Sequence, residues 1–321
     1  MGLKIKKTAH YVPAKVVTND DLKSLMDTSN EWILSRTGIK KRHIAKIEQT
    51  SDLATKVAQD LLKKSKCSAE NIDFIIVATM SPDYLMPSTA SIVQGKIGAQ
   101  NALAFDINAA CAGFVYALTI ADKLLTAYRY GIVIGAEVLS KLVDWHERST
   151  AVLFGDGAGG VLVERSCKQS LVAEDLTTFG KMTEILTAGY QPLNSAFNKD
   201  QIDKHKKYFE MDGGTVYRFA IREVPNSIIR TVAKADWKID RIHWFILHQA
   251  NSRIIESIAN HLGQDKFKFM SNVENYGNTS AASIPILLDE MVKAKQIKRG
   301  QRLILSGYGG GLTVGSAAIV Y

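Results

Sequence analysis

The chain has 321 residues, of which 46% are hydrophobic and 22% charged, and this composition fits an ordinary soluble globular protein. That length is too great for one small core, so we expect two domains of about 150 residues each. Three cysteines without close spacing, Cys67, Cys111 and Cys167, argue against a disulfide framework and a zinc site, and for a reducing compartment.

The N-terminal sequence MGLKIKKTAHYVP lacks the apolar core of a signal peptide, and the apolar run at 74–78 is too short to span a bilayer. We therefore expect a cytoplasmic protein with no membrane contact. The net charge of +8 indicates either a surface that favours solubility or an acidic binding partner. Only 8% of residues are aromatic and no basic stretch interleaves aromatics, so no nucleic acid partner is expected.

Apolar runs and helical periodicities alternate along the chain, which predicts α/β layering. In the first half we expect helices at 53–62 and 112–125, and strands at 72–79, 104–107 and 130–137. The second half repeats this order. We expect a strand at 242–249, a helix at 251–263, a strand beginning at 269, then a turn and a helix, and a strand at 302–310. In this repeat Cys111 and Asn278 occupy corresponding turns, each just before a helix.

A duplicated α/β unit predicts two similar domains with a site in the cleft between them. The polar stretch 164–170 has no periodicity, so we place the boundary there and expect domains at 1–170 and 171–321. The glycine-rich GDGAGG at 155–160 matches a dinucleotide pattern, but VLVE follows it as a strand rather than a helix. We therefore expect a tight hairpin and no nucleotide there.

Cys111 lies in DINAACAGF, between a predicted strand and a predicted helix. A buried cysteine is usually a small apolar residue, but a helix N-terminus favours the thiolate and lowers the pKa of the thiol. Small neighbours also leave room for a substrate. Cys111 is therefore a candidate nucleophile, whereas Cys67 and Cys167 lie in polar surroundings and are expected to be incidental.

Two polar residues in the second half are candidate partners for this nucleophile. His248 ends the predicted strand FILHQ, and Asn278 lies in the turn YGNTS before a helix. A lone histidine or a turn asparagine is more often structural, but the repeat brings all three to one cleft. The glycine loop at 306–315 can direct a backbone N–H at an oxyanion, a contact worth about 3 kcal/mol.

Six ordered motifs carry a resemblance to a known family: WILSRTGIKKRHIA, ACAGF, FGDGAG, HQANSRII, YGNTSAAS and GYGGGLTVG. Together they resemble bacterial β-ketoacyl-acyl-carrier-protein synthase III of the thiolase-like superfamily. The resemblance implies duplicated α/β halves in a layered α-β-α-β-α architecture. It also implies an acyltransferase that initiates fatty-acid synthesis by decarboxylative condensation of a short acyl-CoA primer, such as acetyl-CoA, with malonyl-acyl carrier protein.

The resemblance also assigns roles to individual residues. Cys111 matches the nucleophile that carries the acyl group, and His248 and Asn278 match the residues that hydrogen-bond the malonyl thioester. Backbone N–H groups of Cys111 and Gly310 match the oxyanion hole. No cofactor and no metal are expected, since acyl-CoA and malonyl-carrier protein are substrates. The matches for coenzyme A or pantetheine are Trp32, Arg36, Thr37, Arg148 and Asn251.

The family is homodimeric and meets its acidic carrier protein with basic residues that match Arg218 and Arg253. Met86 stands where phenylalanine is common and, by resemblance, bounds the acyl pocket across the dimer interface. Tyr308 replaces a common phenylalanine and Val314 a common tryptophan. The segment at 186–209 is divergent and matches no site, so its role and the primer preference are left open.

Other classes of protein use similar sets of residues. A thiolase needs a second catalytic cysteine, elongating synthases use two histidines, and plant-type polyketide synthases are usually longer. A papain-like protease also orders Cys, His and Asn, but its flanking motif is absent around Cys111. A dimeric scaffold with a redox-sensing thiol would leave His248 and Asn278 without a role.

Overall fold

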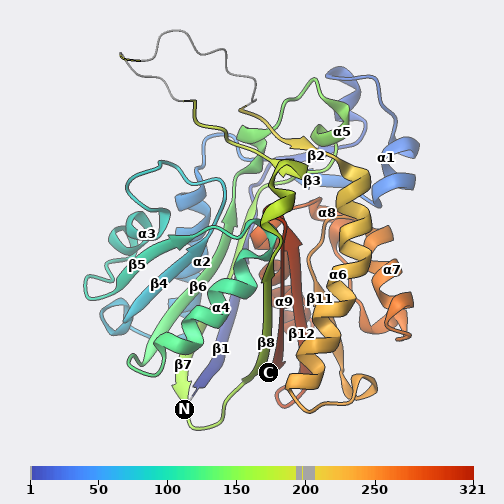
Figure 1. Ribbon diagram of the computed structural model, residues 1–321. Coiled ribbons are helices and arrows are strands. Elements are labelled where there is room, and N and C mark those ends of the chain that lie inside the picture. The colour runs from blue at the N-terminus through green and yellow to red at the C-terminus, as the bar shows by residue number, and fades with distance from the viewer. Residues whose placement is uncertain (1, 193–196, 198–206) are drawn as a thin grey trace.

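The computed structural model describes residues 2–192, 197 and 207–321. Two mixed sheets stand side by side, with helices between them and on both outer faces (Figure 1). The first sheet pairs β6, β4 and β5 in parallel and adds β7 and β1 antiparallel. Its strands in spatial order are β1 (Gly2–Tyr11), β7 (Gly157–Ser166), β6 (Tyr130–Glu137), β4 (Phe74–Ala78) and β5 (Leu103–Ile107).

The second sheet has the same connectivity with one strand fewer. Its parallel pair β11–β12 is followed by antiparallel β13 and β8, as β4–β6 is followed by β7 and β1. This common order confirms the predicted repeat. Its strands are β11 (Trp244–Leu247), β12 (Arg302–Gly309), β13 (Thr313–Val320) and β8 (Leu171–Thr178).

One part of the predicted repeat is wrong. The strand expected around Phe269 is absent from the described chain there, and a short 3-10 turn at Lys266–Lys268 leads into a loop instead. Phe269 stacks on Phe245 of β11, with ring centroids 4.4 Å apart, so its burial comes from aromatic packing. The adjacent apolar residues Phe269 and Met270 therefore do not indicate a strand, because Phe269 is buried against an aromatic ring of the sheet.

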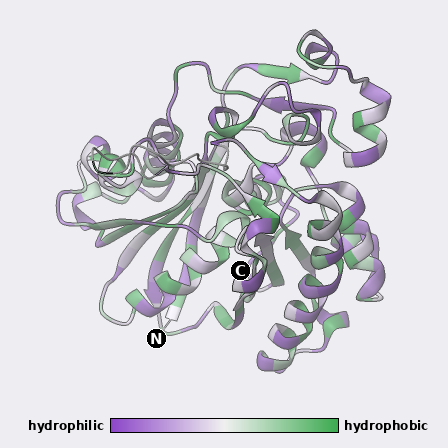
Figure 2. Cartoon of the chain, turned by 45° about the horizontal axis from the view of Figure 1, so that its top comes forward, coloured by the Kyte–Doolittle hydropathy of each residue, from purple (hydrophilic) through white to green (hydrophobic). Residues whose placement is uncertain are grey.

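Five layers result from the helix positions. Helices α4 (Gly113–Leu124) and α9 (Ser283–Lys293) pack between the sheets, and each contacts strands of both. The outer helices α2 (Thr50–Ser65) and α3 (Thr89–Ile97) cover the first sheet, and α6 (Gly213–Lys234) and α7 (Ser252–His261) cover the second. The predicted α-β-α-β-α architecture is confirmed, and hydropathy agrees, since the outer helices carry both hydrophilic and hydrophobic residues (Figure 2).

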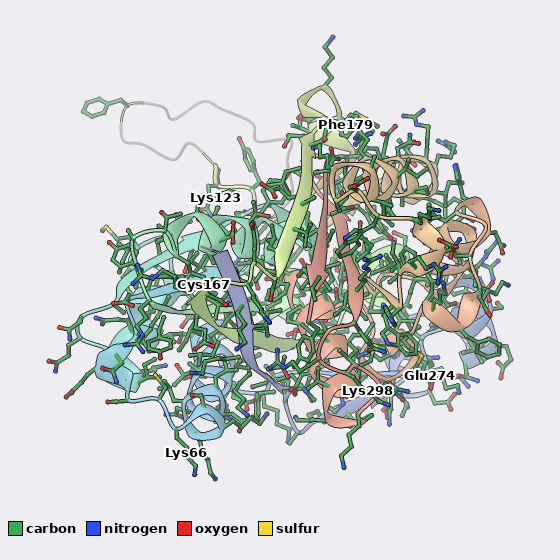
Figure 3. The ribbon with its side chains drawn as sticks, turned by 90° about the horizontal axis from the view of Figure 1, so that it is seen from below. Lys66, Lys123, Cys167, Phe179, Glu274 and Lys298 are labelled. Carbon is green, nitrogen blue, oxygen red and sulfur yellow. The ribbon has the colours of Figure 1, made fainter. Side chains whose placement is uncertain are left out.

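The two halves share a core. Phe74 on β4, Phe114 on α4 and Leu303 on β12 belong to one buried apolar cluster that crosses from the first sheet to the second. The first sheet uses residues 2–166 and the second residues 171–320, with Cys167 exposed in the connection (Figure 3). We therefore propose the division into 1–170 and 171–321 as two interlocked halves.

The remaining short elements form a cap over one end of both sheets (Figure 1). They are β2 (Val16–Thr18), α1 (Asn30–Thr37), β3 (Lys41–His43), α5 (Arg148–Ala151), β9 (Leu186–Thr187), β10 (Glu210–Met211) and α8 (Val273–Tyr276). Four of them, α1, α5, β9 and β10, carry residues that line the cavity described below.

The glycine-rich stretch at 155–160 is not a hairpin turn, which corrects the sequence prediction. Its last four residues begin β7, and helix α9 packs against that strand. A Cβ atom at Gly159 would lie 2.6 Å from the backbone nitrogen of Ile286 in α9. Gly159 is thus explained by the close packing of β7 on α9, and the glycine pattern needs no nucleotide to account for it.

Candidate active site

A cavity of about 490 Å³ lies where the two halves meet at the capped end. Cys111, His248 and Asn278 all line it, although more than a hundred residues separate Cys111 from each of the other two. Each follows the carboxyl end of a strand or precedes an inner helix, and the pseudo-symmetric sheets direct these ends to one place. The fold therefore brings the predicted triad together.

The turns before α4 and α9 correspond closely, as the repeat predicts. Asn108 Oδ1 accepts a hydrogen bond from the N–H of Ala110, and Asn278 Oδ1 accepts one from Ser280. Ala110 and Ser280 have φ values of 45° and 47°, a rare conformation for residues with a side chain. The counterpart of Asn278 is thus Asn108, three residues before Cys111.

Cys111 lies at the predicted strand-to-helix junction, in a 3-10 turn that leads into α4. Burial raises the pKa of its thiol to about 12, and the Ser280 hydroxyl opposes this only in part. The expectation of a lowered pKa is wrong for this structure, because desolvation outweighs the helix terminus and the charge of Glu137 also raises the pKa. Cys111 is therefore a neutral thiol near pH 7.

His248 is 2% exposed, and burial lowers the pKa of its imidazole to about 3. The ring is consequently neutral near pH 7. Its Nδ1 atom lies 2.7 Å from Oγ of Ser283, at the start of α9, so Nε2 is the nitrogen left for the cavity. The sequence analysis did not identify Ser283. Its position as the last residue of the motif YGNTSAAS was the signal that could have done so.

Asn278 is fixed on both sides by backbone bonds. Its N–H donates to Leu153 O at 2.8 Å, and its carbonyl accepts from the N–H of Gly155 at 3.0 Å. Because Ser280 N–H already occupies Oδ1 at 2.8 Å, the Nδ2 amide hydrogens are the free donors of this side chain. Asn278 therefore presents a donor to the cavity.

The last residues of β12, which lead into the glycine loop, run directly against the nucleophile. A Cβ atom at Gly309 would lie 2.6 Å from the backbone nitrogen of Cys111, and one at Gly307 would lie 2.8 Å from its carbonyl oxygen. Only glycine allows this approach. Gly310, the predicted oxyanion residue, lines the cavity beside Cys111.

At the mouth of the cavity two guanidinium groups lie over one aromatic ring. Arg36 and Arg148 lie 4.5 and 4.6 Å from the ring centroid of Trp32, and Arg148 also donates to Asp27 O. Thr37 and Asn251 line the same wall, and Asn251 Nδ2 donates to Arg36 O at 2.8 Å. These predicted residues are thus neighbours, and all but Arg148 line the cavity itself.

The remaining predicted residues lie outside the inner cavity. Arg253 lines its mouth on α7 and Arg218 lies on α6, and both side chains are exposed on helices that contact each other. Met86 is 86% exposed in the loop between β4 and α3 and does not line the cavity of its own chain.

The divergent segment at 186–209, which matched no site, does contribute to the cavity. Leu186, Thr187, Ala188 and Phe209 line it, and strands β9 and β10 pair as a hairpin beside it. Phe209 stacks on Phe154 with ring centroids 4.1 Å apart. Residues 193–196 and 198–206 of this segment lie outside the described residues.

A buried acid next to the site escaped the sequence reasoning. Glu137 ends β6 with no exposed surface, and its carboxyl accepts from Thr79 Oγ1, Met80 N and Ser81 Oγ. Burial raises the pKa of Glu137 to about 7 despite these bonds. The signal that could have identified Glu137 is its position as a charged residue at the end of the apolar run YGIVIGAE.

Neither Cys67 nor Cys167 lines this cavity, and Cys167 is exposed. Across residues 2–192, 197 and 207–321, no group of three or more His, Cys, Asp and Glu side chains could hold a metal ion. Within the same ranges no helix is both long and apolar enough to cross a bilayer.

Comparison with known proteins decides the family. The family described as 3-oxoacyl-[acyl-carrier-protein] synthase III matches residues 105–189, and its C-terminal part matches residues 232–321. A β-ketoacyl-[acyl-carrier-protein] synthase III of Streptococcus gordonii is 55% identical over 320 residues, 98% of both chains. The chain belongs to the β-ketoacyl-[acyl-carrier-protein] synthase III family.

Two further relatives agree with this assignment. The synthase III of Oenococcus oeni is 56% identical over 322 residues, 99% of each chain. The crystal structure of 3-oxoacyl-[acyl-carrier-protein] synthase III from Aquifex aeolicus superposes with a TM-score of 0.93 at 42% identity and covers 100% of both chains. Members of this family are condensing acyltransferases, so the papain-like protease and the redox scaffold are excluded.

Proposed function

We propose that this synthase III family member joins a short acyl-CoA primer to malonyl-acyl carrier protein, through an acyl group carried on Cys111. The observation that carries the proposal is the meeting of Cys111, His248 and Asn278 in one cavity of about 490 Å³. A nucleophile and two polar partners in a largely apolar pocket suit covalent acyl transfer.

In the first half-reaction the Cys111 sulfur attacks the thioester carbonyl of acyl-CoA. A bond forms between sulfur and the acyl carbon, the bond to coenzyme A breaks, and the thiol proton leaves with the departing thiol. Backbone N–H groups of Cys111 and Gly310 stabilise the tetrahedral oxyanion. The close approach of the glycine loop to Cys111 supports this, since these donors need no rearrangement.

In the second half-reaction malonyl-carrier protein loses carbon dioxide, and the resulting enolate attacks the acyl carbon on Cys111. One proton is taken up by the leaving cysteine, and β-ketoacyl-carrier protein is the product. Asn278 Nδ2 and His248 Nε2 stabilise the enolate oxygen, so the reaction needs no strong base to form the carbanion. The atoms balance without a cofactor or a metal.

The neutral state of His248 supports this role. A neutral imidazole donates from Nε2 only if Nδ1 carries no hydrogen, and Ser283 provides that arrangement when its hydroxyl donates to Nδ1. Ser283 Oγ also lies 2.8 Å from Ser280 O, and its single proton serves one of these two acceptors. We assign it to His248 when malonyl thioester is bound.

The mouth of the cavity suits coenzyme A. We propose that the adenine enters between Trp32 and Arg148, while Arg36, Thr37 and Asn251 line the pantetheine path. The stacking of both guanidinium groups on Trp32 supports this, because the same faces can take a nucleobase. These cations also favour the phosphates of the ligand.

We propose that the acidic carrier protein docks on α6 and α7 through Arg218 and Arg253. Both side chains are exposed, the helices contact each other, and Arg253 reaches the mouth through which the carrier's pantetheine must pass. The net charge of +8 favours such a partner in general. The reaction takes place in the cytoplasm on this proposal.

We propose a homodimer formed along the edge of the first sheet. Strand β5 is the edge strand, and Leu103 on it is 45% exposed. Tyr84, Leu85 and Met86 in the neighbouring loop are also exposed apolar residues, which is typical of an interface. Met86 can then bound the acyl pocket of the partner chain.

The test is intact-protein mass after mixing with a panel of acyl-CoAs, for the wild type and Cys111→Ala, followed by a chase with malonyl-carrier protein. An acyl adduct on the wild type alone, discharged by the chase, is expected. It would also rank the primers. An adduct that survives in Cys111→Ala, or no adduct from any acyl-CoA, would overturn the assignment.

A further inference from the structure

Tyr308 belongs to the catalytic cavity, although the triad does not include it. It lies on β12 between Gly307 and Gly309, the two glycines that run against Cys111. Its ring meets the His248 ring edge to face, with centroids 5.2 Å apart and an interplanar angle of 71°. Tyr308 therefore lines the cavity beside His248.

The hydroxyl of Tyr308 has no hydrogen-bond partner among the described residues, and its oxygen is buried. Burial, and then the nearby Cys111, raise the pKa of this phenol, so it keeps its proton and can donate. An unpartnered buried donor costs free energy unless a ligand supplies an acceptor. The position beside Cys111 and His248 makes a substrate oxygen the acceptor that this cavity can supply.

The two substrates offer different oxygens. The acyl primer has one oxygen at its reacting carbon, and the backbone N–H groups of Cys111 and Gly310 take it on our proposal. The malonyl thioester carbonyl goes to His248 and Asn278. The malonyl carboxylate has two oxygens and no donor assigned to it, and it must lie near the cysteine-bound acyl group for the new carbon–carbon bond to form.

We propose that Tyr308 Oη donates a hydrogen bond to the carboxylate of the malonyl group and so positions it for decarboxylation. This inference rests on the proposed function of the site. The contact exists in the ground state and is lost as carbon dioxide leaves, because the negative charge moves to the enolate oxygen. It therefore contributes to binding the malonyl substrate and not to stabilising the transition state.

Tyr308→Phe removes only this hydroxyl and tests the inference. We expect KM and kcat for malonyl-carrier protein both to rise, KM by about tenfold, so that kcat/KM stays nearly unchanged. The rate of acyl-Cys111 formation from acyl-CoA, followed by intact mass, should stay as in the wild type. The melting temperature should hold or rise, because an unpartnered buried hydroxyl is lost.

Tyr116→Phe is the matched control. Its hydroxyl already donates to Thr177 O at 3.2 Å and lies outside the cavity, so KM for malonyl-carrier protein should not change. A lower kcat in Tyr308→Phe with unchanged KM would overturn the inference and assign the hydroxyl to the enolate. Slower acylation would overturn it in favour of the primer, and a clear loss of melting temperature would assign the hydroxyl a structural role.

The two levels of hypothesis fail differently. If the wild type and Tyr308→Phe both form the acyl adduct and have equal KM for malonyl-carrier protein, this inference fails while the proposed function stands. If the wild type forms no adduct at all, the proposed function fails and this inference fails with it.

Discussion

The Nδ1 atom of His248 lies 2.7 Å from Oγ of Ser283, and this contact joins the end of β11 to the start of α9. It crosses from the second sheet to an inner helix and fixes the orientation of a ring that burial keeps neutral. The reactivity of the histidine therefore depends on a hydroxyl 35 residues further along the chain.

Ser283→Ala should reveal this dependence. Without the hydroxyl, Nδ1 can carry the ring hydrogen, and Nε2 then faces the cavity without a donor. We expect kcat for condensation to fall about tenfold while acylation of Cys111 is unchanged. The control is Ser227→Ala, a buried serine on α6 that bonds Asp175 and Ser316 and does not line the cavity. Equal losses in both half-reactions would contradict the prediction.

Asn278→Ala should separate the two half-reactions further. The free Nδ2 donor is lost, so malonyl decarboxylation and condensation should fall about a hundredfold. Acyl-Cys111 formation should change far less, because the oxyanion donors remain in place. The measurement compares adduct formation by mass with carbon dioxide release. A matching decline in both would refute this division of labour.

Glu137→Gln should change how stability depends on pH. The native carboxyl has a pKa of about 7 against a usual value of 4.5, so its stabilising contribution is complete below pH 4.5 and is lost as the pH rises through 7. Between pH 5 and pH 8 the wild type should lose about 3 kcal/mol relative to Glu137→Gln. Urea unfolding of both proteins across this range measures the difference, and parallel pH profiles would contradict the raised pKa.

Arg253→Glu and Arg148→Ala form a complementary pair. Arg253→Glu should raise KM for malonyl-carrier protein about fivefold and leave KM for acyl-CoA nearly unchanged, because it repels an acidic partner. Arg148→Ala removes a stacking cation at Trp32 and should do the reverse. Steady-state kinetics with each substrate varied tests both. Indistinguishable shifts for the two substrates would place Arg253 away from the carrier surface.

The sequence by itself determined the elements and their repeat, because apolar periodicity reports burial residue by residue. It identified Cys111 at a strand-to-helix junction and a histidine at a strand end, and it indicated the five layers through a family resemblance. Predictions from local sequence patterns were wrong where a residue is buried by another segment of the chain. Phe269 is buried by stacking on Phe245, and the close approach of α9 explains Gly157 and Gly159.

Only the tertiary structure decided how the site residues act together. The distance between Cys111 and its partners depends on how two sheets face across α4 and α9, which no local pattern contains. Burial from both halves raises the pKa of the Cys111 thiol, against the helix-terminus effect that sequence suggested. The same desolvation leaves Glu137 half-protonated near pH 7. The fold also buries the Tyr308 hydroxyl where the described residues offer it no hydrogen-bond partner.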